Sequence, residues 1–399
     1  MQLRGWISGA RWRASDTVLV LATVLAQGVI TIPSAQTQTY SLLYSFQCGT
    51  YGANPYGGLV LDVSGNLYGT TDLGGARGDG TIFKLTPIGA ETLLHSFAGS
   101  PTDAASPVST LVRDPAGNLY GTTGTGGVND VGAVFKLTPN GTETLLHSFN
   151  KTPRDGAYAY PGLFRDGVGN LYGTTTLGGA HGDGTVFKLT PSGTETLLHS
   201  FAGSPADGEH PHAGAVRDRA GNLYGTTLDG GAFGDGVVFE LSPGGAETVL
   251  HSFGGSPGDG RHPHAFLVRD TAGNLYGTTL EGGAFNEGTV FELTPRGTET
   301  LLHSFDGSPN DGQTPHAGLV RDAAGNLYGT TLDGGAFGDG VVFELSPGGA
   351  ETVLHSFAKS TTDGGTPESA LVQDAAGNLY GTTYYGGASG CGTVFKYTP

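Results

Sequence analysis

Two sets of residues that could do chemistry recur in this sequence at an interval of 52 positions. The histidines of the first set are His212, His264 and His316, and the phenylalanines of the second set are Phe233, Phe285 and Phe337. Imidazole rings can bind divalent metals or carry protons near neutral pH, whereas exposed phenyl rings can stack against a ligand. The constant interval indicates that both sets lie on equivalent units of one repeated fold.

Related residues occupy the same positions in the preceding unit. Tyr160 stands where the next unit has His212, and His181 stands where it has Phe233. Aromatic and imidazole groups gathered on one face could form a shallow platform for a glycan or another small ligand. The candidate ligand-binding residues are therefore Tyr160, His181, His212, His264, His316, Phe233, Phe285 and Phe337.

A divalent metal, calcium or zinc, is an alternative occupant of the same loops. Two more histidines precede His212 and His264 by two residues, and carboxylates are frequent nearby. Imidazole suits zinc, and carboxylate oxygen suits calcium. The candidate metal ligands are His210, His212, His262, His264 and His316. His-Pro-His is not a dedicated ligand spacing, however, so ordinary solvated loops stay open as a third interpretation.

Residues that recur with the fold itself are more simply structural. The histidine of a His-Ser-Phe string is found at His95, His147, His199, His251, His303 and His355. An aspartate precedes a Gly-Asn turn at Asp62, Asp114, Asp166, Asp218, Asp270, Asp322 and Asp374. We expect the aspartates to cap turns and the histidines to satisfy hydrogen bonds inside each unit.

The sequence leaves open whether the protein is an enzyme. An enzyme needs an asymmetric pair, such as a nucleophile with its base or an acid with a base. The chain contains no His-Glu-x-x-His motif and no phosphate-binding loop. A binding module is the favoured hypothesis. The alternative is a hydrolase or lyase of esters, lactones or polysaccharides, with or without a metal ion.

The elements that position these residues come from one repeated unit. The string Gly-Asn-Leu-Tyr-Gly-Thr-Thr begins at Gly65, Gly117, Gly169, Gly221, Gly273, Gly325 and Gly377. Each unit holds four strand-like runs separated by Gly- and Asn-containing turns, without a helix-length periodic segment. This pattern predicts an all-β fold, a seven-bladed β-propeller of four-stranded blades, over residues 40–399. The predicted units are 55–97, 107–149, 159–201, 211–253, 263–305, 315–357 and 367–399.

The two ends of the repeat region complement each other. The seventh unit stops after its third strand, and a strand of the missing type is found at residues 40–46. We expect this N-terminal strand to complete the last blade and close the ring. Cys48 and Cys391 would then lie on the same face of one blade, which predicts a disulfide between them in an exported protein.

The first 35 residues differ from the rest. Arg4, Arg11 and Arg13 precede a mostly apolar run from Thr17 to Ile32, a pattern typical of a secretory signal peptide at residues 1–35. The run is short for a membrane span, so no stable span is expected after cleavage. The net charge of −17 argues against nucleic-acid binding. We expect a secreted monomer whose partner is an extracellular glycan, small molecule or protein.

The repeated unit resembles the GloVer tandem repeats of secreted bacterial proteins, which are named for Gloeobacter and Verrucomicrobia. The resemblance rests on the string at Gly318–Thr331, on Gly178–Ala180 and on Gly184–Pro191, and it covers essentially all of residues 40–399. It implies an extracellular or surface-associated protein. The chain ends at Pro399 without a C-terminal anchor, which favours release or residence in the periplasm. The family brings no established activity and no catalytic residues.

Overall fold

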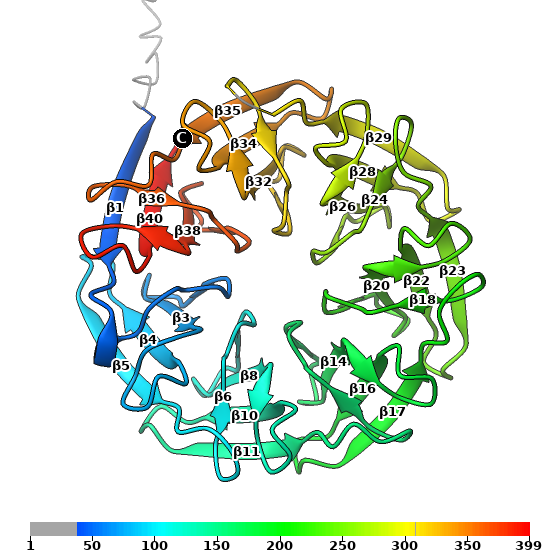
Figure 1. The fold of residues 1–399 in the computed structure, drawn as a ribbon, viewed down its shortest axis with the longest axis horizontal. Helices are drawn as coiled ribbons and strands as arrows, with labels where there is room; N and C mark the ends of the chain where they lie inside the picture. Colours follow the sequence, from blue (N-terminus) through cyan, green and yellow to red (C-terminus); the bar gives the residue numbers. More distant parts are fainter. Residues whose placement is uncertain (1–37, 308) are drawn as a thin grey trace, which may run out of the picture. The chain divides into compact units, whose positions relative to one another are not determined.

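The computed structural model describes residues 38–399 except residue 308, and the predicted signal peptide at residues 1–35 lies outside the described residues. The described chain forms seven four-stranded antiparallel sheets arranged in a ring (Figure 1). Each sheet is one blade, whose fourth strand runs along the rim of the ring. The all-β, seven-bladed propeller predicted from the sequence is confirmed.

The strands of each blade are given from the channel outward. Blade 1 has β2 (Val60–Leu61), β3 (Leu67–Thr71), β4 (Thr81–Leu85) and β5 (Glu91–Ser96); blade 2 has β7 (Val112–Arg113), β8 (Leu119–Thr123), β10 (Ala133–Leu137) and β11 (Glu143–Ser148). Blade 3 has β13 (Phe164–Arg165), β14 (Leu171–Thr175), β16 (Thr185–Leu189) and β17 (Glu195–Ser200); blade 4 has β19 (Val216–Arg217), β20 (Leu223–Thr227), β22 (Val237–Leu241) and β23 (Glu247–Ser252). Blade 5 has β25 (Val268–Arg269), β26 (Leu275–Thr279), β28 (Thr289–Leu293) and β29 (Glu299–Ser304); blade 6 has β31 (Val320–Arg321), β32 (Leu327–Thr331), β34 (Val341–Leu345) and β35 (Glu351–Ser356). Blade 7 has β37 (Val372–Gln373), β38 (Leu379–Thr383), β40 (Thr393–Thr398) and β1 (Thr39–Ser45).

The Leu-Tyr-Gly-Thr-Thr string forms the second strand of each blade because its pattern suits a fully buried strand. All five residues of β3 are buried, and its glycine lies opposite Phe83 of β4. A Cβ atom on Gly69 would come within 2.6 Å of the Phe83 ring, so the glycine makes room for that ring. The hydroxyls of Thr71 and Thr81 lie 2.7 Å apart and satisfy each other inside the sheet.

Phenylalanine pairs hold neighbouring blades together. Phe97, which follows β5, meets Phe135 of the next blade edge to face, with ring centroids 5.2 Å apart. Both rings are fully buried, and the same contact recurs at every junction between blades. Burial of each ring contributes roughly 3 kcal/mol and the edge-to-face geometry about 1 kcal/mol more. These seams form the apolar core of the ring.

The hairpin aspartates cap turns, as the sequence predicted. The Oδ1 atom of Asp166 accepts hydrogen bonds from the backbone N–H groups of Val168 and Asn170. Its Oδ2 atom accepts from the Asn170 side chain at 2.9 Å and from the Tyr172 hydroxyl at 3.3 Å. Because the asparagine and tyrosine contacts recur in all seven blades, this aspartate serves the fold and not a single site.

The His-Ser-Phe histidines are also structural, as predicted. His147 Nε2 lies 3.1 Å from Asp155, whose carboxylate also accepts the backbone N–H of Asn150. Each of the six histidines pairs in this way with an aspartate eight residues later. A glutamate of the following blade, here Glu195, joins the pair, and its ligand atom lies within 4.8 Å of the other two. We call this group the inter-blade carboxyl cluster.

The ring closes as the sequence predicted. Strand β1 pairs antiparallel with β40, so that Tyr40 lies opposite Tyr397 and Ser45 opposite Thr393. Figure 1 shows β1 at the outer edge of the blade that contains the C-terminus. Cys48 and Cys391 form the predicted disulfide, with Cα atoms 5.6 Å apart.

The structure adds elements that the sequence pattern did not predict. Six two-stranded ribbons pair the loop that leads into a blade with the loop between its second and third strands. The ribbons are β6 (Ala104–Ala105) with β9 (Thr125–Gly126), β12 (Gly156–Ala157) with β15 (Leu177–Gly178), β18 (Gly208–Glu209) with β21 (Asp229–Gly230), β24 (Gly260–Arg261) with β27 (Glu281–Gly282), β30 (Gly312–Gln313) with β33 (Asp333–Gly334), and β36 (Gly364–Gly365) with β39 (Tyr385–Gly386). In blade 1 a single bridge between Ala53 and Leu73 takes this place, after the 3-10 turn η1 (Gly49–Tyr51). We call the face with the ribbons the upper face.

The described residues include no helix that is both long enough and apolar enough to cross a membrane.

Candidate functional site

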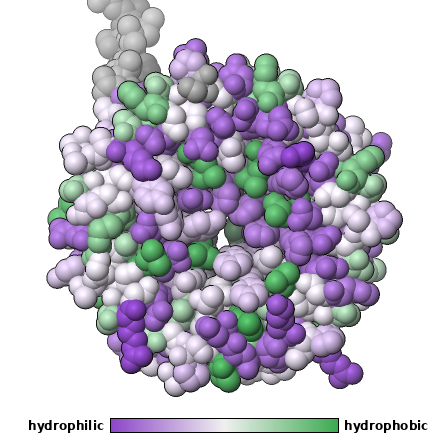
Figure 2. All heavy atoms as spheres, viewed as in Figure 1, coloured by the Kyte–Doolittle hydropathy of each residue, from purple (hydrophilic) through white to green (hydrophobic). Residues whose placement is uncertain are grey.

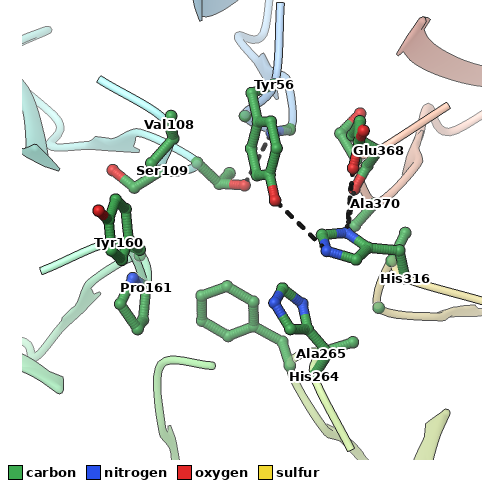
Figure 3. Close-up of a pocket in the computed structure, with 18 of the residues that line it drawn as sticks. Tyr56, Val108, Ser109, Tyr160, Pro161, His264, Ala265, His316, Glu368 and Ala370 are labelled. Carbon is green, nitrogen blue, oxygen red and sulfur yellow. Dashed lines mark hydrogen bonds and ion pairs between the residues drawn. The ribbon is translucent and has the colours of Figure 1, made fainter. Parts of the chain in front are cut away.

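A cavity of about 400 Å³ lies where the central channel meets the upper face. We call it the channel-mouth pocket. Its lining residues are Tyr56, Asp72, Ser106, Val108, Thr125, Tyr160, His212, His264 and Tyr384. Below it the channel narrows to a space of about 70 Å³, where His316 and Glu368 join the wall (Figure 3). Phe266 also lines this narrow part. Figure 2 shows a narrow opening at the centre of the ring.

A proline–glycine contact between blades aims the wall residues into the channel. His264 follows Pro263, and a Cβ atom on Gly236 of the preceding blade would come within 2.6 Å of the Pro263 ring. Gly236 has a φ of 98°, which favours glycine, so no larger residue fits there. The proline is therefore pinned against the neighbouring blade and fixes where the next side chain starts. The same contact precedes Tyr56, Val108, His212, His316 and Glu368.

His212, His264 and His316, which recur at intervals of 52 residues, form a continuous row on the pocket wall. We call them the histidine row. The ring centroids of His212 and His264 lie 4.7 Å apart, and those of His264 and His316 lie 3.8 Å apart. Burial and the neighbouring His316 lower the pKa of His212 to about 4, and burial lowers the pKa of His316 to about 4 as well. Burial and the neighbouring His316 and His212 also lower the pKa of His264. All three rings are therefore neutral at pH 7.

One histidine belongs to a hydrogen-bonded chain. His316 Nδ1 lies 3.3 Å from the backbone carbonyl of Glu368 and 3.4 Å from its carboxylate. Because a carbonyl oxygen only accepts, Nδ1 carries the proton and Nε2 is left as an acceptor. The Tyr56 hydroxyl, 3.3 Å from Nε2, then donates to it, as the dashed lines in Figure 3 trace. Burial and the charge of Asp333 raise the pKa of Glu368 to about 7.

Three tyrosines and an aspartate form the opposite part of the pocket. The rings of Tyr56 and Tyr384 meet edge to face at 6.2 Å. Tyr160 leans over Gly124, where a Cβ atom would collide with its ring. Burial raises the pKa of the Asp72 carboxyl, and the neighbouring Ser106 hydroxyl partly opposes this rise. We call Tyr56, Tyr160, Tyr384 and Asp72 the tyrosine box.

Phe266 occupies the narrow part of the channel. Its ring would lie 2.5 Å from a Cβ atom on Gly214 and 2.9 Å from one on Gly162, so these glycines leave the space that it fills. The equivalent positions of the other units hold Gly58, Thr110, Gly162, Gly214, Gly318 and Ala370. A single large side chain therefore fills space that the small residues of the other blades leave free.

The repeat that builds this site matches a sequence family described as the Gloeobacter/Verrucomicrobia repeat, over residues 23–218 and 211–399. The chain belongs to this repeat family. A search of curated proteins found no match to this member of the repeat family.

Solved structures share the fold of this member of the Gloeobacter/Verrucomicrobia repeat family. Virginiamycin B lyase from Staphylococcus aureus matches with a TM-score of 0.60 and 13% identity, covering 91% of this chain and 99% of the lyase. The extracellular domain of a hybrid two component system from B. thetaiotaomicron matches with a TM-score of 0.57 and 12% identity, covering 91% of this chain and 41% of that one. A protein described as a 6-phosphogluconolactonase from Bacteroides uniformis matches with a TM-score of 0.51 and 19% identity, covering 79% of this chain and 88% of that one. At such identities the likeness concerns the fold alone.

The sequence-predicted ligand residues separate into two groups. Tyr160, His212, His264 and His316 lie together on the channel wall. The side chains of Phe233, Phe285 and Phe337 are 69%, 58% and 64% exposed, and His181 is also exposed. None of these four lines the two channel cavities described above.

The predicted metal ligands also separate. His210 Nδ1 lies 3.0 Å from one oxygen of Asp229, and His262 Nε2 lies 3.6 Å from the other, so one carboxylate bridges both rings. His210, Asp183 and Glu209 place three potential ligand atoms within 4.8 Å of one another. Among the described residues, no such group of three includes His212, His264 or His316.

Several pocket residues were absent from the sequence-based set. Tyr56 and Glu368 occupy the repeat position of His212, His264 and His316, but their blades lack the histidine–phenylalanine pattern, and Tyr384 occupies the repeat position of Asp72. Asp72 follows the second strand of its blade, where the other units hold Gly124, Thr176, Leu228, Leu280, Leu332 and Tyr384. The signal that could have found Asp72 is that it is the one charged residue in this column.

Proposed function

We propose that this protein is an extracellular binding module that takes a glycan or another small molecule into the channel-mouth pocket. The observation that carries the proposal is the composition of that pocket. A volume of about 400 Å³ falls in the range of small-molecule sites, and aromatic walls with a few polar groups are typical of them. The pocket residues also differ from blade to blade, unlike the residues that serve every blade equally.

The extracellular location is part of the proposal. A disulfide between residues 48 and 391 fits an oxidising compartment, where such bonds form and persist. The predicted signal peptide at residues 1–35 points the same way. The net charge of −17 for the whole sequence also suits a soluble protein that meets neutral or cationic partners.

Calorimetric titration with a panel of sugars, amines and small acids tests the proposal. We expect at least one class to bind with one-to-one stoichiometry, and we expect Tyr160→Ala to weaken that binding at least about tenfold. Phe337→Ala is the matched control, because its ring is exposed and lies outside the pocket lining. Loss of binding in Phe337→Ala with retention in Tyr160→Ala would move the site to the phenylalanine rim.

A second candidate function rests on one specific observation. The chain Glu368–His316–Tyr56 gives the channel an asymmetric acid–base group, which a hydrolase or lyase would need. A carboxyl with a pKa near 7 beside a neutral imidazole can give or take a proton at physiological pH. Turnover of an ester, lactone or polysaccharide that disappears in both Glu368→Gln and His316→Gln would support this candidate. An inert wild-type protein on such panels would remove it.

A further inference from the structure

The charge of the channel-mouth pocket is negative, without a compensating cation in its wall. No lysine or arginine is found among the residues that line the pocket or the narrow channel below it. The histidine row is neutral at pH 7, since the pKa values of His212 and His316 are about 4. The acidic groups are Asp72 at the mouth and Glu368 in the narrow part. An anionic ligand would therefore meet repulsion without any opposing attraction.

The aspartate lies within electrostatic reach of all three tyrosines. Besides burial, the charge of Asp72 raises the pKa of Tyr56, of Tyr160 and of Tyr384. All four side chains line the same cavity, although Tyr56 and Asp72 belong to blade 1, Tyr160 to blade 3 and Tyr384 to blade 7. Tyrosines and a carboxylate that line one cavity suit the recognition of organic cations, because ring faces and the carboxylate both attract positive charge.

The carboxyl of Asp72 lacks a cationic partner of its own. Its neighbour is the Ser106 hydroxyl, and no described residue forms a salt bridge with it. Burial without a countercharge is costly for a carboxylate, and a bound cation would relieve that cost. The structure therefore holds a half-buried carboxyl without a countercharge, in a cavity that three tyrosines also line.

We propose that the ligand of the channel-mouth pocket is a small molecule with a protonated or quaternary ammonium group, held by Asp72 and the faces of Tyr56, Tyr160 and Tyr384. The inference rests on the proposed binding function and narrows its ligand class. An amino sugar and a choline-like molecule share the required ammonium group. The neutral imidazoles of the histidine row can exchange hydrogen bonds with the remaining part of the ligand.

Matched ligand pairs test the inference on the disulfide-bonded protein. Choline is compared with 3,3-dimethylbutan-1-ol, its neutral isostere, and glucosamine is compared with glucose, each by calorimetry at pH 7. We expect choline or glucosamine to bind at least about tenfold more tightly than its neutral partner. We also expect this preference to weaken as the pH is lowered and the carboxyl of Asp72 gains a proton.

Two variants locate the effect. Asp72→Asn should remove the preference for the charged ligand, and Tyr160→Leu should weaken ammonium binding by roughly five- to tenfold. Asp339→Asn, in an upper-face loop outside the pocket lining, is the control for the general acidity of the protein, and it should keep the preference. Circular dichroism of each variant checks that the ring is intact.

The outcomes separate this inference from the proposed function. Equal binding of charged and neutral partners, or an unchanged preference in Asp72→Asn, would overturn the ammonium inference. Binding of neutral sugars alone would also overturn it, while leaving the binding function in place. Failure of every compound in both panels would overturn the two proposals together.

Discussion

Replacing Glu195 by glutamine should stabilise the ring at pH 8 and leave its stability at pH 5 unchanged. Glu195 belongs to the inter-blade carboxyl cluster with His147 and Asp155. Its Oε1 atom is buried without a hydrogen-bond partner among the described residues. Burial, and then the charge of Asp155, raise the pKa of this carboxyl from 4.5 to about 7.

The direction of the pH effect follows from this raised pKa. Between about pH 4.5 and 7 the folded protein keeps a proton on Glu195 that the unfolded chain has lost. The stabilising contribution is complete below the unfolded pKa, and it is lost as the pH rises through about 7. His147 acts in the same direction. Burial lowers its pKa, but the hydrogen bond with Asp155 and the charges of Asp155 and Glu195 together raise it by more.

The size of the effect can be bounded. A shift from 4.5 to about 7 would correspond to roughly 3 kcal/mol at about 1.4 kcal/mol for each pKa unit. Because Glu195 is only half-buried, water screens much of this interaction, and we expect about 1 kcal/mol for the single replacement at pH 8. Four other clusters contain a glutamate whose pKa is raised to about 7. These clusters favour the folded ring at pH 5 over pH 8, whereas the three channel histidines oppose them, because their lowered pKa values keep them neutral in the fold while the unfolded chain gains protons.

Urea unfolding followed by circular dichroism at pH 5 and pH 8 measures the effect. Glu195→Gln should raise the midpoint at pH 8 but not at pH 5. Glu287→Gln, in an upper-face loop outside the clusters, is the control and should change neither midpoint. A lower midpoint for Glu195→Gln than for the wild type at pH 8, or a rise at pH 5 as large as that at pH 8, would refute the reasoning.

Three further predictions concern the fold. Cys48→Ser should lower the free energy of unfolding by about 4 kcal/mol in denaturant titrations, since the disulfide restricts a very long loop of the unfolded chain; a midpoint equal to that of the oxidised wild type would contradict this. Phe135→Ala should cost about 4 kcal/mol, whereas Phe233→Ala should change stability by less than about 0.5 kcal/mol, and similar thermal midpoints for the two variants would count against the seam model. Asp166→Ala should cost about 2 kcal/mol because it leaves the Asn170 amide and the Tyr172 hydroxyl without their acceptor, and a neutral effect in urea unfolding would show that water replaces the carboxylate.

The repeat made the fold predictable, because the strands and turns assigned to one unit had to fit the residues of all seven units. Comparison of the units separated Asp166, which every blade needs, from the histidine series, which only three blades carry. The closure could be predicted because the seventh unit lacks its fourth strand and Tyr40–Phe46 supplies one. The two cysteines then lie on the same blade.

The site was less accessible to this reasoning. From the sequence, Phe233 and His212 were predicted to share one ligand face, because both belong to upper-face loops. In the structure Phe233 is exposed and lies outside the lining of the channel cavities. The distance of a residue from the channel depends on how the blades are arranged in the ring. The spacing of residues along the chain does not reveal that distance. Asp72 and Phe266 were missed because each is a single departure from its column, and its effect depends on the blades across the channel.

The pairing of β1 with β40 has a consequence for the order in which the protein can be assembled. The ribosome makes β1 before any blade and β40 after six complete blades, so the first strand of the ring is the last to find its partner. Until then its backbone groups are an open edge on which a strand from another copy could pair. A circularly permuted chain, with residues 39–48 moved behind Pro399, would make every blade contiguous and shorten that exposure. Such a chain should give less aggregate during refolding, although its finished ring contains the same contacts.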